Sequence, residues 1–253
     1  MKPDNSVDPA GWAEVIPEDQ WRMFVGGVDA LEAKHVPFVL HGALGLAAYT
    51  GRFRNTKDVD VVVRERDRER AIAAVRAAGF ADYFEQEAYD RSWIFRGWQS
   101  NGIFDLIWAL PNHRVEIDAP WFDRGRPVQL RGRGMMAAPA EEIIRVKLYV
   151  MQRGRCDWPD LLNLLAAVGS EIDWRWLMQR MGADLGLLHA LLATFNWLAP
   201  ERARGLPGWV RAQFALEDFP VDDPDATEAR RVPLFDSRPW FALHQSPEQP
   251  LER

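Results

Sequence analysis

The chain has 253 residues, of which 47% are hydrophobic and 27% are charged, a composition that suits a globular protein of one large or two small domains. The formal net charge is −6 and the pI is about 5.5. A protein that grips long nucleic acid usually carries a basic field, so no double-stranded DNA partner is expected.

A single cysteine, Cys156, excludes an internal disulfide and fits a reducing compartment. Residues 1–20 are polar and acidic, unlike a signal peptide. The apolar stretch 185–198 is interrupted by His189 and Asn196. It is also shorter than the roughly 20 apolar residues of a membrane span. We therefore expect a soluble, cytoplasmic protein without a membrane partner.

The first half of the chain shows a mixed pattern of helix and strand periodicity. Gln99-Ser100-Asn101-Gly102 has the composition of a hairpin turn. The expected elements are a helix from Pro17, a strand over 36–41, a helix over 43–49, a strand over 59–63, a helix over 67–79, and strands over 93–98, 103–110 and 115–117.

From Pro139 onward the pattern is helical, over 141–153, 159–168, 174–181 and 185–198. The Gly/Arg-rich run 131–134 marks the expected boundary between the halves, and the arginines at 124, 126, 131 and 133 are expected to lie in a solvated loop. After Gly205 the sequence is rich in proline and charge, which predicts an irregular tail. The expected organisation is an α/β domain over 1–138, a helical domain over 139–204 and a tail over 205–253.

The segment that carries chemistry contains Asp58 and Asp60 at the start of a valine-rich strand. Side chains alternate along a strand, so the two carboxylates share one face, about 7 Å apart at Cα. Hard carboxylate oxygens suit Mg²⁺, and two such ions stabilise the attacking and leaving oxygens of an in-line displacement. Asp-x-Asp also occurs on surface loops, but here it follows a strand, a glycine turn and a short helix, which favours the functional interpretation.

A two-metal cage needs a third carboxylate, and Asp105 is the first candidate. It lies within the apolar strand 103–108, where a lone charge is unfavourable unless something pairs it. A metal ion would do so, and a salt bridge to one of the arginines is the competing explanation. Asp118, near the end of the expected strand 115–117, is the reserve candidate.

This arrangement resembles the DNA polymerase β-like nucleotidyltransferase superfamily over residues 38–110. The run Arg54-x-Thr56-x-Asp58-x-Asp60 is similar to the branch of antibiotic and abortive-infection or toxin-type nucleotidyltransferases. Lys147, followed by Asp157 and Asp160, is also similar to that branch. The resemblance implies a small mixed β-sheet domain (an α/β, or α+β, fold) with a helical C-terminal half and the active site between them.

The resemblance also implies a nucleotide site at Gly42, Ala43, Arg54 and Lys147. The family has a second Gly or Ser where this chain has Ala43, which offers a backbone N–H at a helix start but no hydroxyl. Arg54 would contact phosphate or substrate, or else lie in solvent. Lys147 falls on the apolar side of its helix, so it either extends to the rim or reaches the phosphates.

The expected reaction is transfer of a nucleoside monophosphate, AMP from ATP, to an acceptor hydroxyl, with two Mg²⁺ ions bound by Asp58, Asp60 and Asp105. The acidic balance of the chain favours a cationic small-molecule acceptor such as an aminoglycoside. An RNA end or a protein side chain is the alternative acceptor. The rival from another class is a non-catalytic nucleotide-binding or partner-binding module on the same fold, which Ala43 favours.

Overall fold

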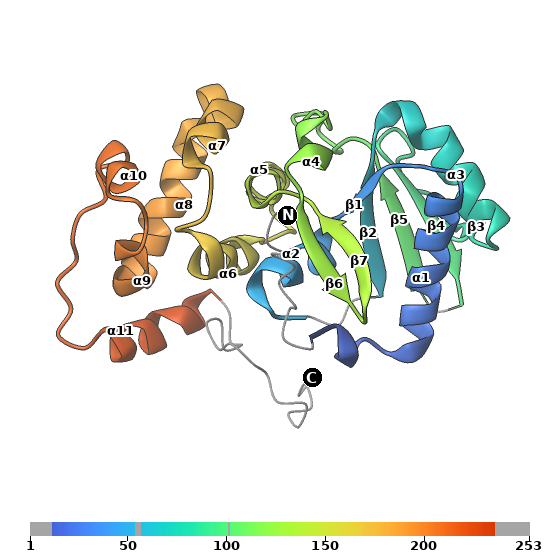
Figure 1. Cartoon of the computed structure of the whole chain (residues 1–253). Helices are drawn as coiled ribbons and strands as arrows, with labels where there is room; N and C mark the ends of the chain where they lie inside the picture. The colour runs from blue at the N-terminus through green and yellow to red at the C-terminus, as the bar shows by residue number, and fades with distance from the viewer. Residues whose placement is uncertain (1–11, 54–56, 101, 236–253) are drawn as a thin grey trace, which may run out of the picture. The chain divides into compact units, whose positions relative to one another are not determined.

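The computed structural model describes residues 12–53, 57–100 and 102–235 (Figure 1). Contacts divide them into two compact units, the first ending at Pro139 and the second beginning at Ala140. None of the helices in these ranges combines the length and the apolar character needed to cross a membrane.

The first unit is built on one mixed sheet. Its described strands are β1 (Phe38–Leu40), β2 (Asp58–Val63), β3 (Ala81–Asp82), β4 (Ile94–Gln99), β5 (Gly102–Ile107), β6 (Arg126–Leu130) and β7 (Arg133–Ala137). These seven strands are ordered β3-β4-β5-β2-β1-β7-β6. The pair β2–β5 is parallel, whereas β1–β2 and β4–β5 are antiparallel. The sheet places β2, which carries the two aspartates, between β1 and β5.

Helices α1 (Glu18–Ala33) and α3 (Arg68–Ala77) contact each other and the strand β5 (Figure 1). Val59, Val61 and Val63 of β2 are buried in one core cluster, together with α1 side chains such as Phe24. A Cβ on Gly27 of α1 would lie 2.4 Å from the ring of Phe104 on β5, so only glycine permits this approach of helix and sheet. Since side chains alternate along β2, Asp58 and Asp60 lie on the face of the sheet away from α1.

Two further helices complete the first unit. Helix α2 (Gly42–Thr50) follows β1 directly and contacts β2 and β7, and the short helix α4 (Pro120–Asp123) contacts β1. The expected strand at 115–117 is not formed, and these residues are a loop leading to α4. Here the carbonyl oxygen of Glu116 accepts a hydrogen bond from the indole of Trp121, which is buried, in place of a strand partner.

The run Arg131-Gly132-Arg133-Gly134 is the turn of a β-hairpin rather than a boundary between the units. Leu130 pairs with Arg133, and the two residues between them both have positive φ, 48° and 75°. This combination is typical of a type I′ hairpin turn. The expectation of solvated arginines is wrong for Arg131, which is bound by Glu18 of α1, and for Arg133, which is bound by Asp29 and Glu32. Arg124 is exposed, as expected.

The second unit is helical in its described residues, as predicted. Its helices are α5 (Ala140–Tyr149), α6 (Trp158–Val168), α7 (Trp174–Met181), α8 (Leu185–Leu198), α9 (Pro200–Arg204), α10 (Gly208–Gln213) and α11 (Pro224–Arg231). The mixed sheet followed by helices confirms the predicted fold class.

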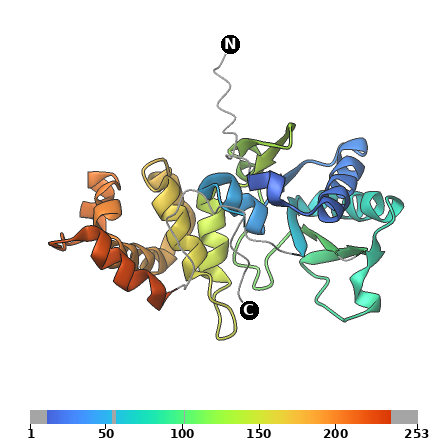
Figure 2. The ribbon, with the colours of Figure 1, turned by 90° about the horizontal axis from the view of Figure 1, so that it is seen from below.

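The segment after Gly205 was expected to be irregular, and this is wrong for its described part. Helix α10 lies within it, and α11 packs on α8 (Figure 2). Asp223 caps α11 by accepting a hydrogen bond from the backbone N–H of Ala226, and a proline opens the first turn. The charges and prolines of this segment therefore begin and anchor a helix.

Candidate active site

The predicted alternation along β2 is present. Asp58 and Asp60 are half-buried, whereas Val59 and Val61 are buried. The two carboxylates therefore share one face of the sheet at its solvent-accessible side, as the sequence predicts.

The neighbouring strands extend this face into a row of charges. Asp60 is in register with Asp105 on β5, and Asp105 is in register with Arg96 on β4. Neighbouring strands lie about 4.8 Å apart, so three ionisable side chains follow one another across the sheet. Of the two candidates for a third carboxylate, Asp105 is the one placed beside the pair, and Asp118 lies in the loop before α4.

Arg96 holds the carboxylate of Asp105 with two hydrogen bonds. Its Nε donates to Oδ1 and its Nη2 to Oδ2, both at 3.1 Å. Asp105 is only 2% exposed and Arg96 is half-buried, so this is a bidentate ion pair with a buried carboxylate. The guanidinium also lies over the ring of Tyr83, and the backbone N–H of Arg96 donates to the hydroxyl of Tyr89. The salt bridge that competed with a metal ion as the partner of Asp105 is therefore formed.

Burial raises the pKa of Asp105 from 3.8 to about 6, because the charge of Asp58 adds to desolvation and Arg96 offsets only part of both. For Arg96, burial lowers the pKa, but the hydrogen bonds and charge of Asp105 and the charges of Asp58 and Asp60 raise it above its ordinary value. The guanidinium of Arg96 thus interacts electrostatically with all three carboxylates.

Gly42, the first residue of α2, lies directly against Asp60. Its φ is +55°, and a Cβ built on it would be 1.7 Å from Oδ2 of Asp60. The position therefore needs glycine for two reasons, the left-handed backbone and the close approach. Ala43 follows in the first turn of α2 and is half-buried. The glycine turn predicted for nucleotide binding and the Asp-x-Asp strand are adjacent in space.

Lys147 lies in the second unit and is buried. Its Nζ donates a hydrogen bond of 2.6 Å to Oδ2 of Asp160 and lies 3.6 Å from Oδ1 of Asp157. Lys147 therefore does not extend to the rim. Asp157 and Asp160 lie at the start of α6, where both carboxylates contact the lysine and Asp157 makes no capping hydrogen bond. Contact of Lys147 with phosphate stays a prediction.

Arg54 and Thr56 lie outside the described residues. Arg96 is the charged residue of this face that the sequence does not single out. A signal for it was present, because a two-residue turn that pairs Gln99 with Gly102 also pairs residue 96 with residue 105.

The residues present fit a cation in part. Asp58 and Asp60 offer half-buried oxygens on one face, the ligand chemistry that Mg²⁺ prefers. The oxygens of Asp105 are both occupied by Arg96. Within the described ranges, no three His, Cys, Asp or Glu side chains are gathered as a metal site.

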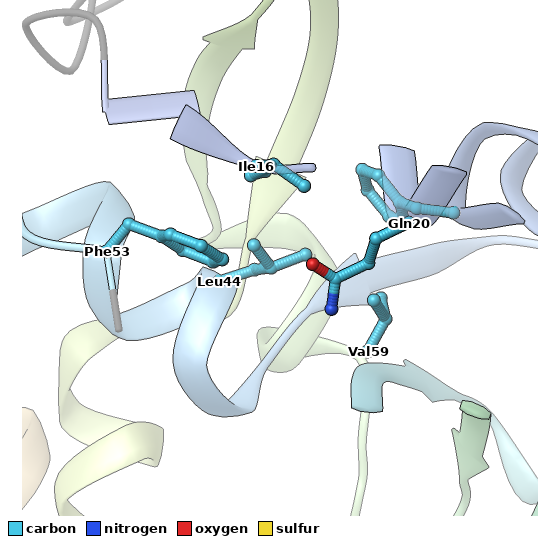
Figure 3. A pocket seen from close by; sticks show the side chains of 6 residues that line it. Ile16, Gln20, Leu44, Phe53 and Val59 are labelled. Carbon is cyan, nitrogen blue, oxygen red and sulfur yellow. The ribbon is translucent and has the colours of Figure 1, made fainter. Parts of the chain in front are cut away.

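A small apolar pocket lies beneath this site (Figure 3). It is lined by Ile16, Gln20, Phe24, Leu44, Phe53 and Val59. Val59 points to the opposite side of β2 from the aspartates. The pocket is therefore a gap in the core rather than a place for a polar substrate.

No protein family matches the chain, and no curated protein matches it in sequence. Solved structures do resemble it. The lincosamide antibiotic adenylyltransferase LnuA, bound to lincomycin, has 13% identity and a TM-score of 0.41 over 59% of this chain and 94% of its own. The antibiotic-resistance factor ANT(2″)-Ia has 17% identity and a TM-score of 0.39 over 78% and 94%.

A third solved structure, JHP933 from Helicobacter pylori, has 17% identity and a TM-score of 0.41 over 85% of this chain and 89% of its own.

Proposed function

We propose that the chain is a Mg²⁺-dependent nucleotidyltransferase that moves a nucleoside monophosphate, AMP from ATP, onto the hydroxyl of a small-molecule acceptor. One observation supports this most strongly, the register that sets Asp105 beside Asp60 on the face that also carries Asp58. The strands that carry these aspartates, β2 and β5, are far apart in sequence. A module that only binds nucleotide has no need of three adjacent carboxylates.

The nucleotide would lie with its phosphates at the start of α2. Backbone N–H groups at a helix N-terminus and the helix dipole favour anions there. Gly42 removes the side chain that would otherwise fill the space at Asp60, and Ala43 offers only its backbone N–H. Arg54 and Lys147 are proposed as further phosphate contacts.

Asp58 and Asp60 would hold the cation, which when bound neutralises phosphate charge as the transfer proceeds. The acceptor oxygen forms a bond to the α-phosphorus, the bond from that phosphorus to the bridging oxygen breaks, and pyrophosphate leaves. A carboxylate oxygen of Asp105 takes the acceptor's proton. Since its pKa is about 6, Asp105 is mostly ionised at neutral pH and still basic enough for this role.

The acceptor is proposed to be cationic. The formal net charge is −6, and three carboxylates line one face of the sheet. A negative site concentrates cationic small molecules and repels polyanions. An RNA end or a protein side chain is the alternative acceptor for the same chemistry.

A second function, nucleotide binding without catalysis, is favoured by the ion pair between Asp105 and Arg96. If that pair only stabilises the fold, Asp105 is not available as a base. This candidate predicts nucleotide binding with no transfer to any acceptor.

The test is calorimetric titration of ATP with Mg²⁺ into the wild-type chain and into Asp58→Ala/Asp60→Ala. The matched control is Glu65→Ala/Glu69→Ala, which removes the same charge from exposed positions in the helical segment that follows β2. We expect Mg²⁺-dependent binding in the wild type and the control and its loss in the aspartate variant. Absence of nucleotide binding by the folded wild type would refute the proposal.

Transfer of labelled nucleotide to drugs, RNA and protein then separates the two candidates. Product formed with a small cationic acceptor supports the proposed enzyme, and product formed only with RNA or protein identifies the alternative acceptor. Binding without product in all three screens supports the non-catalytic module.

A further inference from the structure

The row of charges across β2, β5 and β4 contains a positive charge that the Asp-x-Asp motif does not predict. Asp60, Asp105 and Arg96 follow one another in register, and Asp58 lies on the same face two residues before Asp60. Both Asp58 and Asp60 act electrostatically on Arg96. Arg96 is thus part of the site itself.

We propose that Arg96 takes the place of one of the two metal ions, so that the site binds a single divalent cation, on Asp58 and Asp60. This inference rests on the function proposed above. It concerns how the carboxylates are neutralised, and it departs from the two-ion site predicted from the sequence.

The geometry of Asp105 disfavours a metal ion on this carboxylate. Both of its oxygens accept a hydrogen bond from one guanidinium at 3.1 Å, and the residue is 2% exposed. A metal ion bound there would share its ligand oxygens with a cation that cannot lose its proton. The two cations would repel each other at that separation, so binding of a metal ion to Asp105 is disfavoured while Arg96 holds it.

Arg96 is also held from several sides. Its guanidinium lies 5.8 Å from the ring centre of Tyr83, and its backbone N–H donates to the hydroxyl of Tyr89 at 3.0 Å. The same hydroxyl donates to Asp82, which is bound by Arg91. The backbone of Arg96 is thus held by Tyr89, and its guanidinium is placed between the ring of Tyr83 and the carboxylate of Asp105.

Charge points the same way. Arg96 already neutralises Asp105 through two hydrogen bonds, so a second divalent ion would approach a carboxylate whose charge is balanced. Asp105, held by Arg96 and bound to no ion, keeps its remaining lone pairs for the acceptor's proton.

Mn²⁺ is a suitable probe because it replaces Mg²⁺ and is paramagnetic. Two Mn²⁺ ions in a shared carboxylate site lie about 3.5–4 Å apart and are magnetically coupled, whereas a single ion gives an uncoupled spectrum. Titration of the full-length chain with Mn²⁺ alone, and with Mn²⁺ plus non-hydrolysable α,β-methylene-ATP, followed by electron paramagnetic resonance, therefore distinguishes one ion from two without any measurement of activity.

We expect one uncoupled Mn²⁺ per wild-type chain and none in Asp58→Asn/Asp60→Asn. Arg96→Gln frees Asp105, and a second ion with a coupled spectrum should appear. The decisive variant is Arg96→Gln/Asp105→Asn, which removes a neutral pair and should keep the single Mn²⁺ with unchanged affinity. Because this variant is charge-balanced, it tests the inference even if Arg96→Gln alone does not fold.

A coupled pair in the wild type, or loss of Mn²⁺ from the folded Arg96→Gln/Asp105→Asn variant, would show that Asp105 is a ligand and would overturn the inference while leaving the proposed function intact. Failure of the wild type to bind any Mn²⁺, with or without the nucleotide, would overturn both.

Discussion

Replacement of Asp105 by Asn removes a buried titratable carboxyl group and keeps a side chain of nearly the same shape. The pKa of Asp105 is raised from 3.8 to about 6, mainly by burial. The difference corresponds to about 3 kcal/mol of free energy between the protonated and ionised forms in the folded state. Comparison of the variant with the wild type therefore measures how protonation of this one carboxyl group changes the free energy of unfolding.

The raised pKa of Asp105 determines in which direction the stability of the fold changes with pH. As the pH falls below about 6, the folded state takes up the proton before the unfolded chain does, and it is stabilised. This contribution is complete below the unfolded pKa of 3.8 and is lost as the pH rises through about 6. Other carboxylates titrate in the same range, but they are present in both proteins and cancel in the comparison.

Urea unfolding of the wild type and of Asp105→Asn, from about pH 7 to about pH 4, measures this effect. Hydrogen exchange of the β5 amides assigns it to the first unit. We expect the stability of the wild type relative to the variant to rise by up to about 3 kcal/mol as the pH falls. A difference that stays constant would refute the argument from burial, and one that falls would mean that Arg96 dominates and the pKa is lowered.

Two further pairs of variants test other positions. Gly42→Ala should lower stability by about 1–3 kcal/mol more than Gly51→Ala in thermal melts, because both have positive φ but only Gly42 would place its Cβ 1.7 Å from Asp60. Gly42→Ala should also weaken ATP binding, and equal effects of the two variants would contradict the close approach. Glu142→Ala should cost about 3–5 kcal/mol of stability, because it leaves buried arginine charge unpaired. The exposed Glu201→Ala should change it by no more than about 1 kcal/mol.

The elements that the sequence predicts well are those whose signal is local. The strand at β2 follows from a run of valines, and the β4–β5 hairpin from its turn residues. The β6–β7 hairpin was missed, although Leu130 and Met135 are buried on its two strands. Its arginines resembled a linker, and their partners on α1 lie more than a hundred residues away in sequence, such as Glu18, 113 residues from Arg131.

In the candidate site, too, some features follow from local sequence and others depend on contacts between distant segments. Asp58 and Asp60 are predictable because the alternation of a strand is a local property, and the hairpin register even pairs residue 96 with residue 105. The significance of that pair depends on the parallel contact of β2 with β5, which joins segments separated by a helix and two strands. Only this contact brings Arg96 into the field of Asp58 and Asp60. The three aspartates therefore predict where a cation would bind, whereas the proposed number of cations depends on a fourth charge, Arg96, whose place is fixed by the order of the strands.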